Sequence, residues 1–216
     1  MSIIIIIIPD RLFEEWIGSK SYNAKWPLMD MMTGQTRTFI SVELPHPDDF
    51  KSITDTLKGI PGVKITPLNQ LHITLSFLGD VDTDRIPKIC SELKLAFKDV
   101  GSFHLSVKGL GAFPNERRAR IIWMGIEDGD VLASCAKIIE RTLKRIGIRH
   151  DKKEFTPHIT IARAKDVVDI SRIIDDHRDD EFLNFDCSSI NVMKSVLKPT
   201  GAEHSVICTI PLKQNV

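Results

Sequence analysis

The sequence has few of the features of a metal-binding protein, of a disulfide-stabilised fold or of a protein that coats nucleic acids through a uniformly basic surface. Its 216 residues include four cysteines, with no C-x-x-C pair and no short spacing to a histidine, so neither a zinc site nor a disulfide framework is expected. A reducing cytoplasm is therefore the expected location. Lys and Arg together number 29, as do Asp and Glu, so there is no overall basic field and any contact with nucleic acid must be local.

Long hydrophobic runs are scarce as well. The start, MSIIIIIIPD, holds six consecutive isoleucines, far short of the roughly 18 to 20 apolar residues of a membrane span, and it lacks the basic region of a signal peptide. A CAT repeat encoding a histidine tag reads as an isoleucine repeat one base out of frame, and MMTGQTRTFISVEL, from Met31, resembles a natural start. We therefore expect residues 1–31 to be an extension outside the functional fold, and 32–216 to form one two-lobed domain.

Hydrophobic periodicity and turn residues predict an alternation of strands and helices from Thr36 onward. Strands are expected at 36–44, 71–78, 103–113, 120–126, 158–164, 185–197 and 203–211. Helices are expected at about 47–58, 83–98, 130–146 and 167–177, with Gly59 and Gly147 as stop signals. The expected fold class is α+β, with no low-complexity linker to separate two independent domains.

The sequence also repeats itself. LHITLSFLG begins at Leu71 and PHITIARA at Pro157, and each follows a helix and, before it, a strand that opens with an arginine, Arg37 or Arg120. This order predicts a duplicated unit. Two similar lobes, with antiparallel-rich sheets and outer helices, would place the two motifs face to face across a central cleft.

Each motif places an imidazole beside a hydroxyl. Because residues i and i+2 of a strand share a face, His72 and Thr74 point one way, with Ser76, while Ile73, Leu75 and Phe77 point toward a helix. The second copy pairs His158 with Thr160. One His-x-Thr is a weak signal, since any half-exposed strand can carry it, but two copies in parallel contexts are much stronger.

Two imidazoles and two hydroxyls suit acid–base chemistry at a phosphate. Histidine titrates near neutrality, so one ring can take a proton from water while the other gives a proton to a leaving oxygen. The threonine hydroxyls would hold phosphoryl oxygens. No thiol, carboxylate cluster or glycine-rich loop is present in either motif.

HITLSFLG and FTPHITIARA, with TRTFISVELP and AFPNERRARIIWMGI, resemble the two-histidine phosphoesterase superfamily, specifically the bacterial and archaeal RNA 2′,3′-cyclic phosphodiesterases, also called 2′-5′ RNA ligases. The resemblance covers about residues 32–213. It implies a two-lobed α+β fold, no metal or other cofactor, and hydrolysis of an RNA 2′,3′-cyclic phosphate to a 2′-phosphate. Some members also join RNA ends through a 2′-5′ bond.

The resemblance further implies roles for the motif residues. His72 would be the general acid that protonates the leaving 3′ oxygen, and His158 the general base for water, although the sequence itself does not decide between the two. Thr74 and Thr160 would bind phosphate. Arg163 would bind it too, but strict alternation places Arg163 on the face opposite His158, so a bulge or twist would be needed to turn it inward.

Other residues carry weaker predictions. Phe39 could stack on a base, although core packing is the more common role. Lys153, in K-x-F-x-P-H, and the cluster Arg117, Arg118 and Arg120 could follow an RNA backbone, although such runs usually form solvated loops. Phe113 and Trp123 are expected in the core. Surface or structural roles are expected for the remaining histidines, His46, His104, His150, His177 and His204.

The expected partner is RNA with 2′,3′-cyclic phosphate ends, fragments of tRNA being one candidate, and the expected state is a monomer with no membrane association. Two alternatives stay open: a non-catalytic protein that binds RNA ends or nucleotides, and a phosphodiesterase for another cyclic or 2′-5′ linked nucleotide. Two intact histidines argue against the first, because a pure binder needs no pair of titrating imidazoles.

Overall fold

The computed structural model describes residues 34–127, 129–150, 155–198 and 201–214, so the predicted extension at 1–31 lies outside the described residues. Within these ranges nine strands are formed: β1 (Gln35–Glu43), β2 (Val63–Ile65), β3 (His72–Asp82), β4 (Phe103–Phe113), β5 (Ala119–Glu127), β6 (His158–Val168), β7 (Glu181–Cys187), β8 (Ser189–Lys198) and β9 (Gly201–Pro211). The α-helices are α3 (Lys51–Lys58), α4 (Ile86–Phe97), α5 (Asp130–Arg145) and α6 (Ser171–Asp176), with short 3-10 helices η1 (Pro47–Phe50), η2 (Leu68–Gln70), η3 (Thr83–Arg85) and η4 (Glu116–Arg118).

The strands form one antiparallel sheet in the order β7-β4-β5-β6-β3-β1-β8-β9, with β2 beside β6. Its two halves are joined where β3 meets β6, through the single residue pair Ile73 and Ile159. The two sheets expected from the sequence are therefore halves of one curled sheet, and the seam between them runs through the two His-Ile-Thr motifs. The α+β, two-lobed architecture is confirmed.

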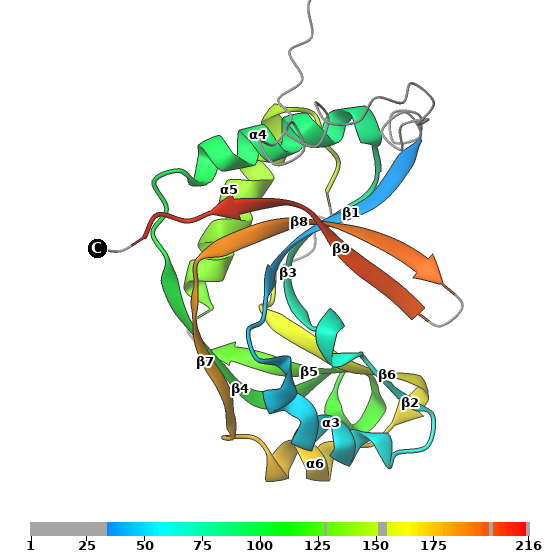
Figure 1. Cartoon of the computed structure of the whole chain (residues 1–216). Helices are drawn as coiled ribbons and strands as arrows, with labels where there is room; N and C mark the ends of the chain where they lie inside the picture. Colours follow the sequence, from blue (N-terminus) through cyan, green and yellow to red (C-terminus); the bar gives the residue numbers. More distant parts are fainter. Residues whose placement is uncertain (1–33, 128, 151–154, 199–200, 215–216) are drawn as a thin grey trace, which may run out of the picture.

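The helices cross between the lobes. Helix α3 follows β1 but contacts β2 and β6 of the other half, and α5 follows β5 but contacts β3 and α4. Figure 1 shows the result: α4 and α5 lie with β1, β8 and β9, while α3 and α6 lie with β4 to β7. Each lobe thus combines strands of one repeat with a helix of the other, which ties the repeats into one body.

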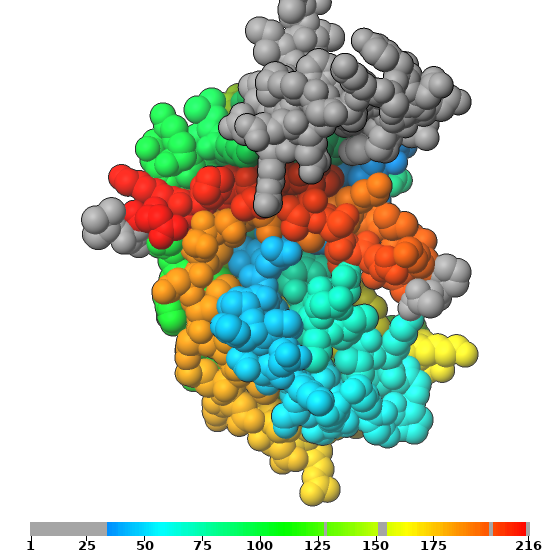
Figure 2. Space-filling model, viewed as in Figure 1, coloured from blue at the N-terminus to red at the C-terminus, as the bar shows by residue number. Residues whose placement is uncertain are grey.

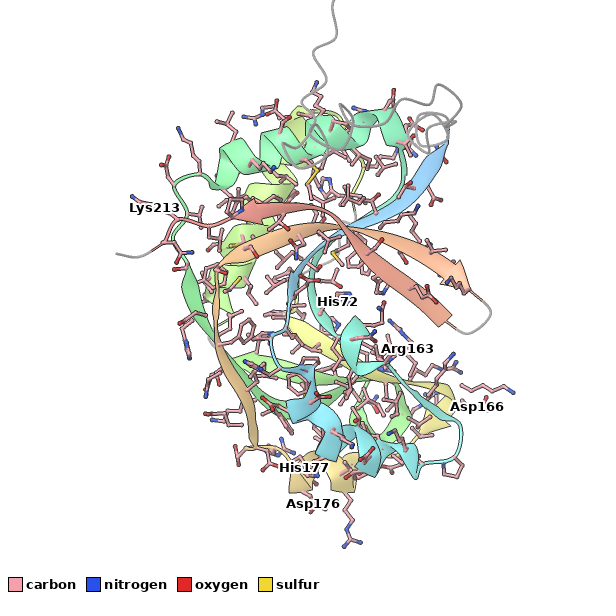
Figure 3. All side chains as sticks on the ribbon, viewed as in Figure 1. His72, Arg163, Asp166, Asp176, His177 and Lys213 are labelled. Carbon is pink, nitrogen blue, oxygen red and sulfur yellow. A yellow bond between two sulfur atoms is a disulfide. The ribbon has the colours of Figure 1, made fainter. Side chains whose placement is uncertain are left out.

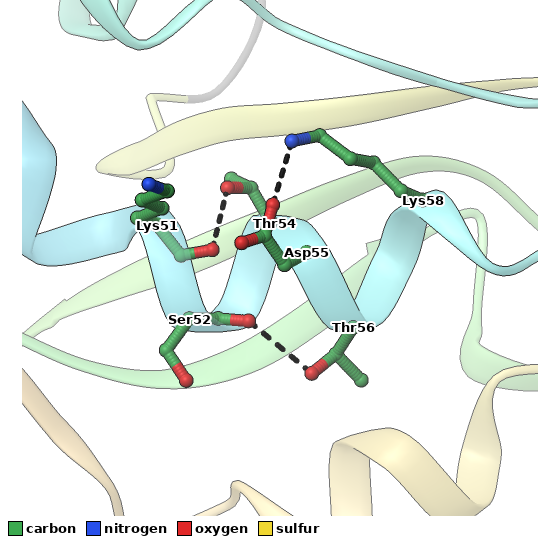
Figure 4. Close-up of polar contacts among 6 residues, drawn as sticks. All are labelled: Lys51, Ser52, Thr54, Asp55, Thr56 and Lys58. Atoms are coloured by element: carbon green, nitrogen blue, oxygen red, sulfur yellow. Dashed lines mark hydrogen bonds and ion pairs between the residues drawn. The ribbon is translucent and has the colours of Figure 1, made fainter.

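Helix α3 illustrates why these segments form helices. Ile53, Thr54 and Leu57 are buried on one face at helical spacing. On the exposed face, Thr56 Oγ1 donates to the Ser52 carbonyl (3.2 Å), and Lys58 Nζ lies 2.6 Å from Asp55 Oδ1 (Figure 4). Exposed pairs of this kind contribute little, so the buried face holds the helix in place.

A single core runs through both lobes. Buried side chains from β1 and β3, such as Ile40 and Ile73, belong to the same cluster as Ile122 and Ile159 from β5 and β6. Burial of this continuous apolar surface supplies most of the stabilisation and fixes the angle between the halves. None of the helices in the described part of the chain is long and apolar enough to cross a membrane.

One covalent link was not expected. Cys90 on α4 and Cys208 on β9 form a disulfide, 118 positions apart in sequence, while Cys135 and Cys187 are free and buried. The cysteine spacing suggested no disulfide framework, and this single bond was not expected from it. No local spacing rule could have found the bond, because it joins two elements that only the fold brings together.

The β8–β9 hairpin extends beyond the rest of the sheet. Figure 2 shows it, in orange and red, standing out on the right above the cyan surface of the first repeat. It is held by the disulfide to α4 and by the Gln70 side chain, whose Oε1 accepts a hydrogen bond from the His204 backbone N–H (2.7 Å). The hairpin is thereby fixed close to the start of β3.

Candidate active site

The seam of the sheet brings the two motifs together. In an antiparallel pairing, opposition of Ile73 and Ile159 sets His72 across from Thr160 and Thr74 across from His158. Each imidazole therefore lies near the hydroxyl of the other motif as well as its own. Ile73 and Ile159 are fully buried, whereas the histidines and threonines are only partly buried on the opposite face.

Both histidines are held by the same local contact. His72 Nδ1 lies 2.7 Å from the Gln70 carbonyl oxygen, and His158 Nδ1 lies 2.7 Å from the Thr156 carbonyl oxygen. Because a carbonyl oxygen only accepts, each Nδ1 carries a proton and donates it. Each Nε2 is left for proton transfer, and each ring is fixed in orientation by a backbone atom two residues earlier.

A bulge recurs at the same place in both motif strands. On β3 the pairing with β1 passes from Thr74 to Ser76 and skips Leu75; on β6 the pairing with β5 passes from Thr160 to Ala162 and skips Ile161. Each skipped residue lies three positions after its histidine. The bulge shifts the alternation of faces, so the fifth residue after each histidine returns to the histidine side of the sheet.

Those fifth residues are Phe77 and Arg163. Phe77 is 46% exposed, and it lies opposite Phe39, its ring centroid 5.8 Å from that of Phe39. The strict alternation expected from the sequence, with Phe77 turned away from His72, is therefore wrong. Arg163 is exposed, and its positive charge adds to the lowering of the His72 pKa, which is caused chiefly by burial. Figure 3 shows His72 and Arg163 below the β8–β9 hairpin.

His72 is packed between two rings. Its ring centroid is 4.9 Å from that of Phe39 and 5.2 Å from that of His204, and the two imidazole planes are almost perpendicular, at 87°. Burial lowers the pKa of His72 to about 4, since desolvation disfavours the cation, and the charges of His204, His158 and Arg163 act in the same direction. Phe39 is 1% exposed and has no open face for a base, which fits the packing alternative.

His158 has its own aromatic neighbours. Phe113 lies edge-on at 5.2 Å between ring centroids, and the Trp123 ring lies at 6.2 Å. Both rings are partly exposed beside His158, so the prediction that they belong to the core is wrong. Gly111 leaves room for the indole, because a Cβ there would lie 2.2 Å from Trp123 ring atoms.

His204 is the residue that sequence reasoning missed. It was assigned a surface or structural role; its ring packs at 4.9 Å from that of Phe39 and 5.2 Å from that of His72, and burial lowers its pKa. No motif surrounds it in the sequence, and only the return of β8–β9 over β3 brings it to the site. The alternation of residue types along 201–211 predicts a strand, but it does not predict which other strand that strand contacts.

The remaining predicted residues are basic side chains proposed to contact the RNA backbone. Arg118 and Arg120 are exposed, at the end of η4 and the start of β5, and Lys153 falls outside the described residues. Two surface pockets, one lined by Asp49, Ser52 and His177 and the other along α5, contain no motif residue. Across the described ranges, no three His, Cys, Asp or Glu side chains gather as metal ligands would.

Comparison with known sequences identifies a family and several relatives. A family model described as the 2′-5′ RNA ligase superfamily matches residues 46–198, which include both motifs. An RNA 2′,3′-cyclic phosphodiesterase of Archaeoglobus fulgidus is 32% identical over 171 residues, covering 76% of this chain and 94% of the relative. A protein of the same description from Methanocaldococcus jannaschii is 29% identical over 176 residues, covering 79% and 98%.

Solved structures share the fold. The protein TT0787 of Thermus thermophilus superposes with a TM-score of 0.71 at 24% identity, over 83% of this chain and 100% of that one. E. coli LigT, solved in complex with 3′-AMP, superposes with a TM-score of 0.67 at 22% identity, over 83% and 99%. At these sequence identities, the similarity to the two solved structures establishes the fold, that is, the arrangement of the two lobes.

Proposed function

The chain belongs to the 2′-5′ RNA ligase superfamily, and we propose that it hydrolyses RNA 2′,3′-cyclic phosphate ends to 2′-phosphomonoesters by acid–base catalysis at His72 and His158. The observation that carries the proposal is the meeting of two identically held histidines at the seam of the sheet. It implies an enzyme that needs no metal ion.

The reaction requires two proton transfers. A base takes a proton from water, and the resulting hydroxide attacks phosphorus. The bond from phosphorus to the 3′ oxygen breaks, and an acid gives that oxygen a proton, which leaves a 3′-hydroxyl and a 2′-phosphate. A 5′-hydroxyl that attacks phosphorus in place of water, with the same bond to the 3′ oxygen broken, would join two RNA ends through a 2′-5′ bond. The same base and the same acid would serve both reactions.

Family resemblance assigns the acid to His72 and the base to His158. With its pKa lowered to about 4, His72 is neutral near pH 7 in the free protein. The acid role therefore requires His72 to take up a proton as the substrate enters, which an anionic phosphate favours because a nearby negative charge stabilises the imidazolium. His158 Nε2, with Nδ1–H held by the Thr156 carbonyl, is suited to accept a proton from water.

The phosphate would lie between the motifs. Thr74 and Thr160 offer hydroxyls across from the two histidines, and Arg163 offers a guanidinium on the same side of the sheet because of the bulge at Ile161. A planar, permanently charged donor suits a phosphodiester anion. Phe77, exposed in the corresponding place of the other repeat, would provide a surface on which the terminal base stacks.

Other elements of the proposal concern the partner. RNA with a cyclic phosphate end is the substrate class, fragments of tRNA are one candidate source, and Lys153, Arg118 and Arg120 are candidate contacts to its backbone. A monomer acting in the cytoplasm remains our prediction. If the chain instead only binds RNA ends, it should retain RNA without turnover.

The test uses a short RNA with a 2′,3′-cyclic phosphate in excess chelator, with the position of the product phosphate determined. We expect a 2′-phosphate from the wild type. Removal of either histidine, as His72→Ala or His158→Ala, should lower turnover by about a hundred- to ten-thousand-fold, the usual contribution of one proton-transfer group. His177→Ala, which removes a histidine paired with Asp180 outside the site, is the matched control.

Three results would contradict the proposal. Turnover that survives both histidine substitutions would place the chemistry elsewhere. Activity lost in chelator and restored by a divalent ion would indicate a metal mechanism. RNA bound by the wild type without any product would favour the binding protein, or a phosphodiesterase for another linkage.

A further inference from the structure

His204 is a third histidine within the cluster, and nothing in the two motifs accounts for it. It comes from β9, over 40 positions after His158, and its ring touches those of His72 and Phe39. The side chain is only half buried, so part of the imidazole reaches the surface beside His72.

The chain holds His204 there with one residue that also holds His72. Gln70 accepts from His72 Nδ1 at its carbonyl oxygen and from the His204 backbone N–H at its side-chain Oε1, each at 2.7 Å. The position of one imidazole is therefore coupled to that of the other. A hairpin that merely packed on the site would not need this link.

The nitrogen atoms of His204 differ in their surroundings. Nδ1 is buried and has no hydrogen-bond partner among the residues that the structure describes. A proton on Nδ1 would be an unsatisfied buried donor, which is costly, so the proton of the neutral ring belongs on Nε2. Burial lowers the pKa of the His204 ring, which favours this neutral form in the free protein. His204 thus presents an N–H donor at the open side of the ring.

The other repeat shows what packing by itself requires. There, Phe113 lies against His158 at the same centroid distance, 5.2 Å, and at nearly the same angle, 85° against 87° for His204 and His72. An apolar ring is thus sufficient to support a motif histidine. The imidazole of His204 beside His72 adds a polar atom that packing does not need.

We propose that His204 is a substrate-binding residue whose Nε2–H donates a hydrogen bond to a phosphate oxygen beside His72. The inference rests on the proposed function, since it assigns a further contact at the same phosphate. Arg163 approaches from β6 and His204 from β9, so the two donors would hold the phosphate from different strands.

The experiment separates the donor from the packing. His204→Phe keeps a ring against Phe39 and His72 but removes Nε2–H, whereas His204→Gln keeps an N–H near the Nε2 position. His104→Phe, the same substitution at an exposed histidine on β4, is the matched control. Because a hydrogen bond to a charged group is lost, His204→Phe should lower kcat/KM by about 10- to 100-fold with an unchanged melting temperature. His204→Gln should recover part of the loss.

Binding is measured in parallel by calorimetry with a nucleoside 2′-monophosphate. We expect His204→Phe to weaken this binding. Wild-type activity and binding in His204→Phe would overturn the inference, as would equal losses in the Phe and Gln variants accompanied by a lower melting temperature.

The outcome is distinguishable from failure of the proposed function. If His72→Ala is inactive while His204→Phe is fully active, the function stands and His204 only packs. If the wild type has no cyclic phosphodiesterase activity, the function fails, and the calorimetric comparison still decides whether His204 contacts phosphate.

Discussion

The two halves of the sheet place the same backbone feature in different chemical surroundings. Each has a His-x-Thr strand, a histidine held through Nδ1 by a carbonyl two residues earlier, and a bulge three residues later. The side chains delivered by the bulge differ, since the first half presents Phe77 and the second presents Arg163. The rings beside the histidines differ as well.

This difference shows which properties the repeat shares and which have diverged. The shared backbone holds both imidazoles through Nδ1 and leaves both Nε2 atoms for the two proton transfers. The diverged positions give an exposed aromatic ring on one side and a cation on the other, which match the base and the phosphate of a nucleotide end. The substrate is asymmetric, so a symmetric pair of strands can bind it only by diverging at such positions.

Substitution at the two diverged positions should separate these roles. Arg163→Ala should lower kcat/KM by about 10- to 100-fold on any cyclic phosphate, because a charge-assisted contact to phosphate is lost. Phe77→Ala should raise KM by about 5- to 100-fold on an RNA substrate, because base–aromatic stacking is lost. Steady-state kinetics measure both effects.

A cyclic phosphate of a ribose without a base is the discriminating substrate. Phe77→Ala should then match the wild type, whereas Arg163→Ala should remain impaired. Leu95→Ala and Arg141→Ala, at exposed positions on α4 and α5, are the matched controls. Equal losses on both substrates in the two variants would mean that the halves have not diverged in this way.

Titration of His72 tests the electrostatics of the first half. Because the ring is buried, the NMR titration midpoint of His72 in the free protein should lie at about 4, below the ordinary histidine pKa of 6.5. The His72 signal is assigned by its absence from the spectrum of His72→Ala. The unfolded chain binds this proton at the ordinary value. The contribution of His72 to the free energy of unfolding is thus present above pH 6.5 and is lost as the pH falls toward 4.

Addition of a nucleoside 2′-monophosphate should raise the midpoint of His72, because the phosphate anion favours the imidazolium. Such a rise is what the general-acid role requires. If the His72 midpoint stays near 4 with phosphate bound, His72 would instead be the general base. His158 would then be the general acid. An ordinary midpoint in the free protein would contradict the effect of burial by Phe39 and His204.

Much of the fold follows from the sequence because it depends on local periodicity. Strands β1, β3, β4, β5, β6 and β9 and helices α4 and α5 agree with the predicted ranges to within a few residues, since apolar spacing and glycine stops define them. The single strand predicted at 185–197 is wrong, because that range joins the end of β7 to β8 across the break at Ser188. Strand β2, Val63–Ile65, was missed because three residues carry no period. The crossing of α3 and α5 between lobes, and the pairing of Cys90 with Cys208, depend on contacts remote in sequence.

The site was predictable where it repeats and unpredictable where it does not. The motifs named His72, Thr74, His158 and Thr160, and the seam of the sheet brings them together. The bulges at Leu75 and Ile161 left no sequence signal, so the face of Phe77 was assigned wrongly and that of Arg163 stayed open. His204 could not be found, because only the path of the hairpin brings β9 beside β3.

Deletion of residues 1–31 is the change for which the smallest effect is expected. The segment precedes only the first repeat, β1 begins at Gln35, and the family match begins at residue 46. The truncated chain should keep the activity of the full chain within about twofold, and the titration of His72 should be the same. Kinetics and NMR on both chains measure this. A loss of activity with a changed His72 midpoint would mean that the extension contributes to the first half, which would then differ from the second by an added segment as well as by side chains.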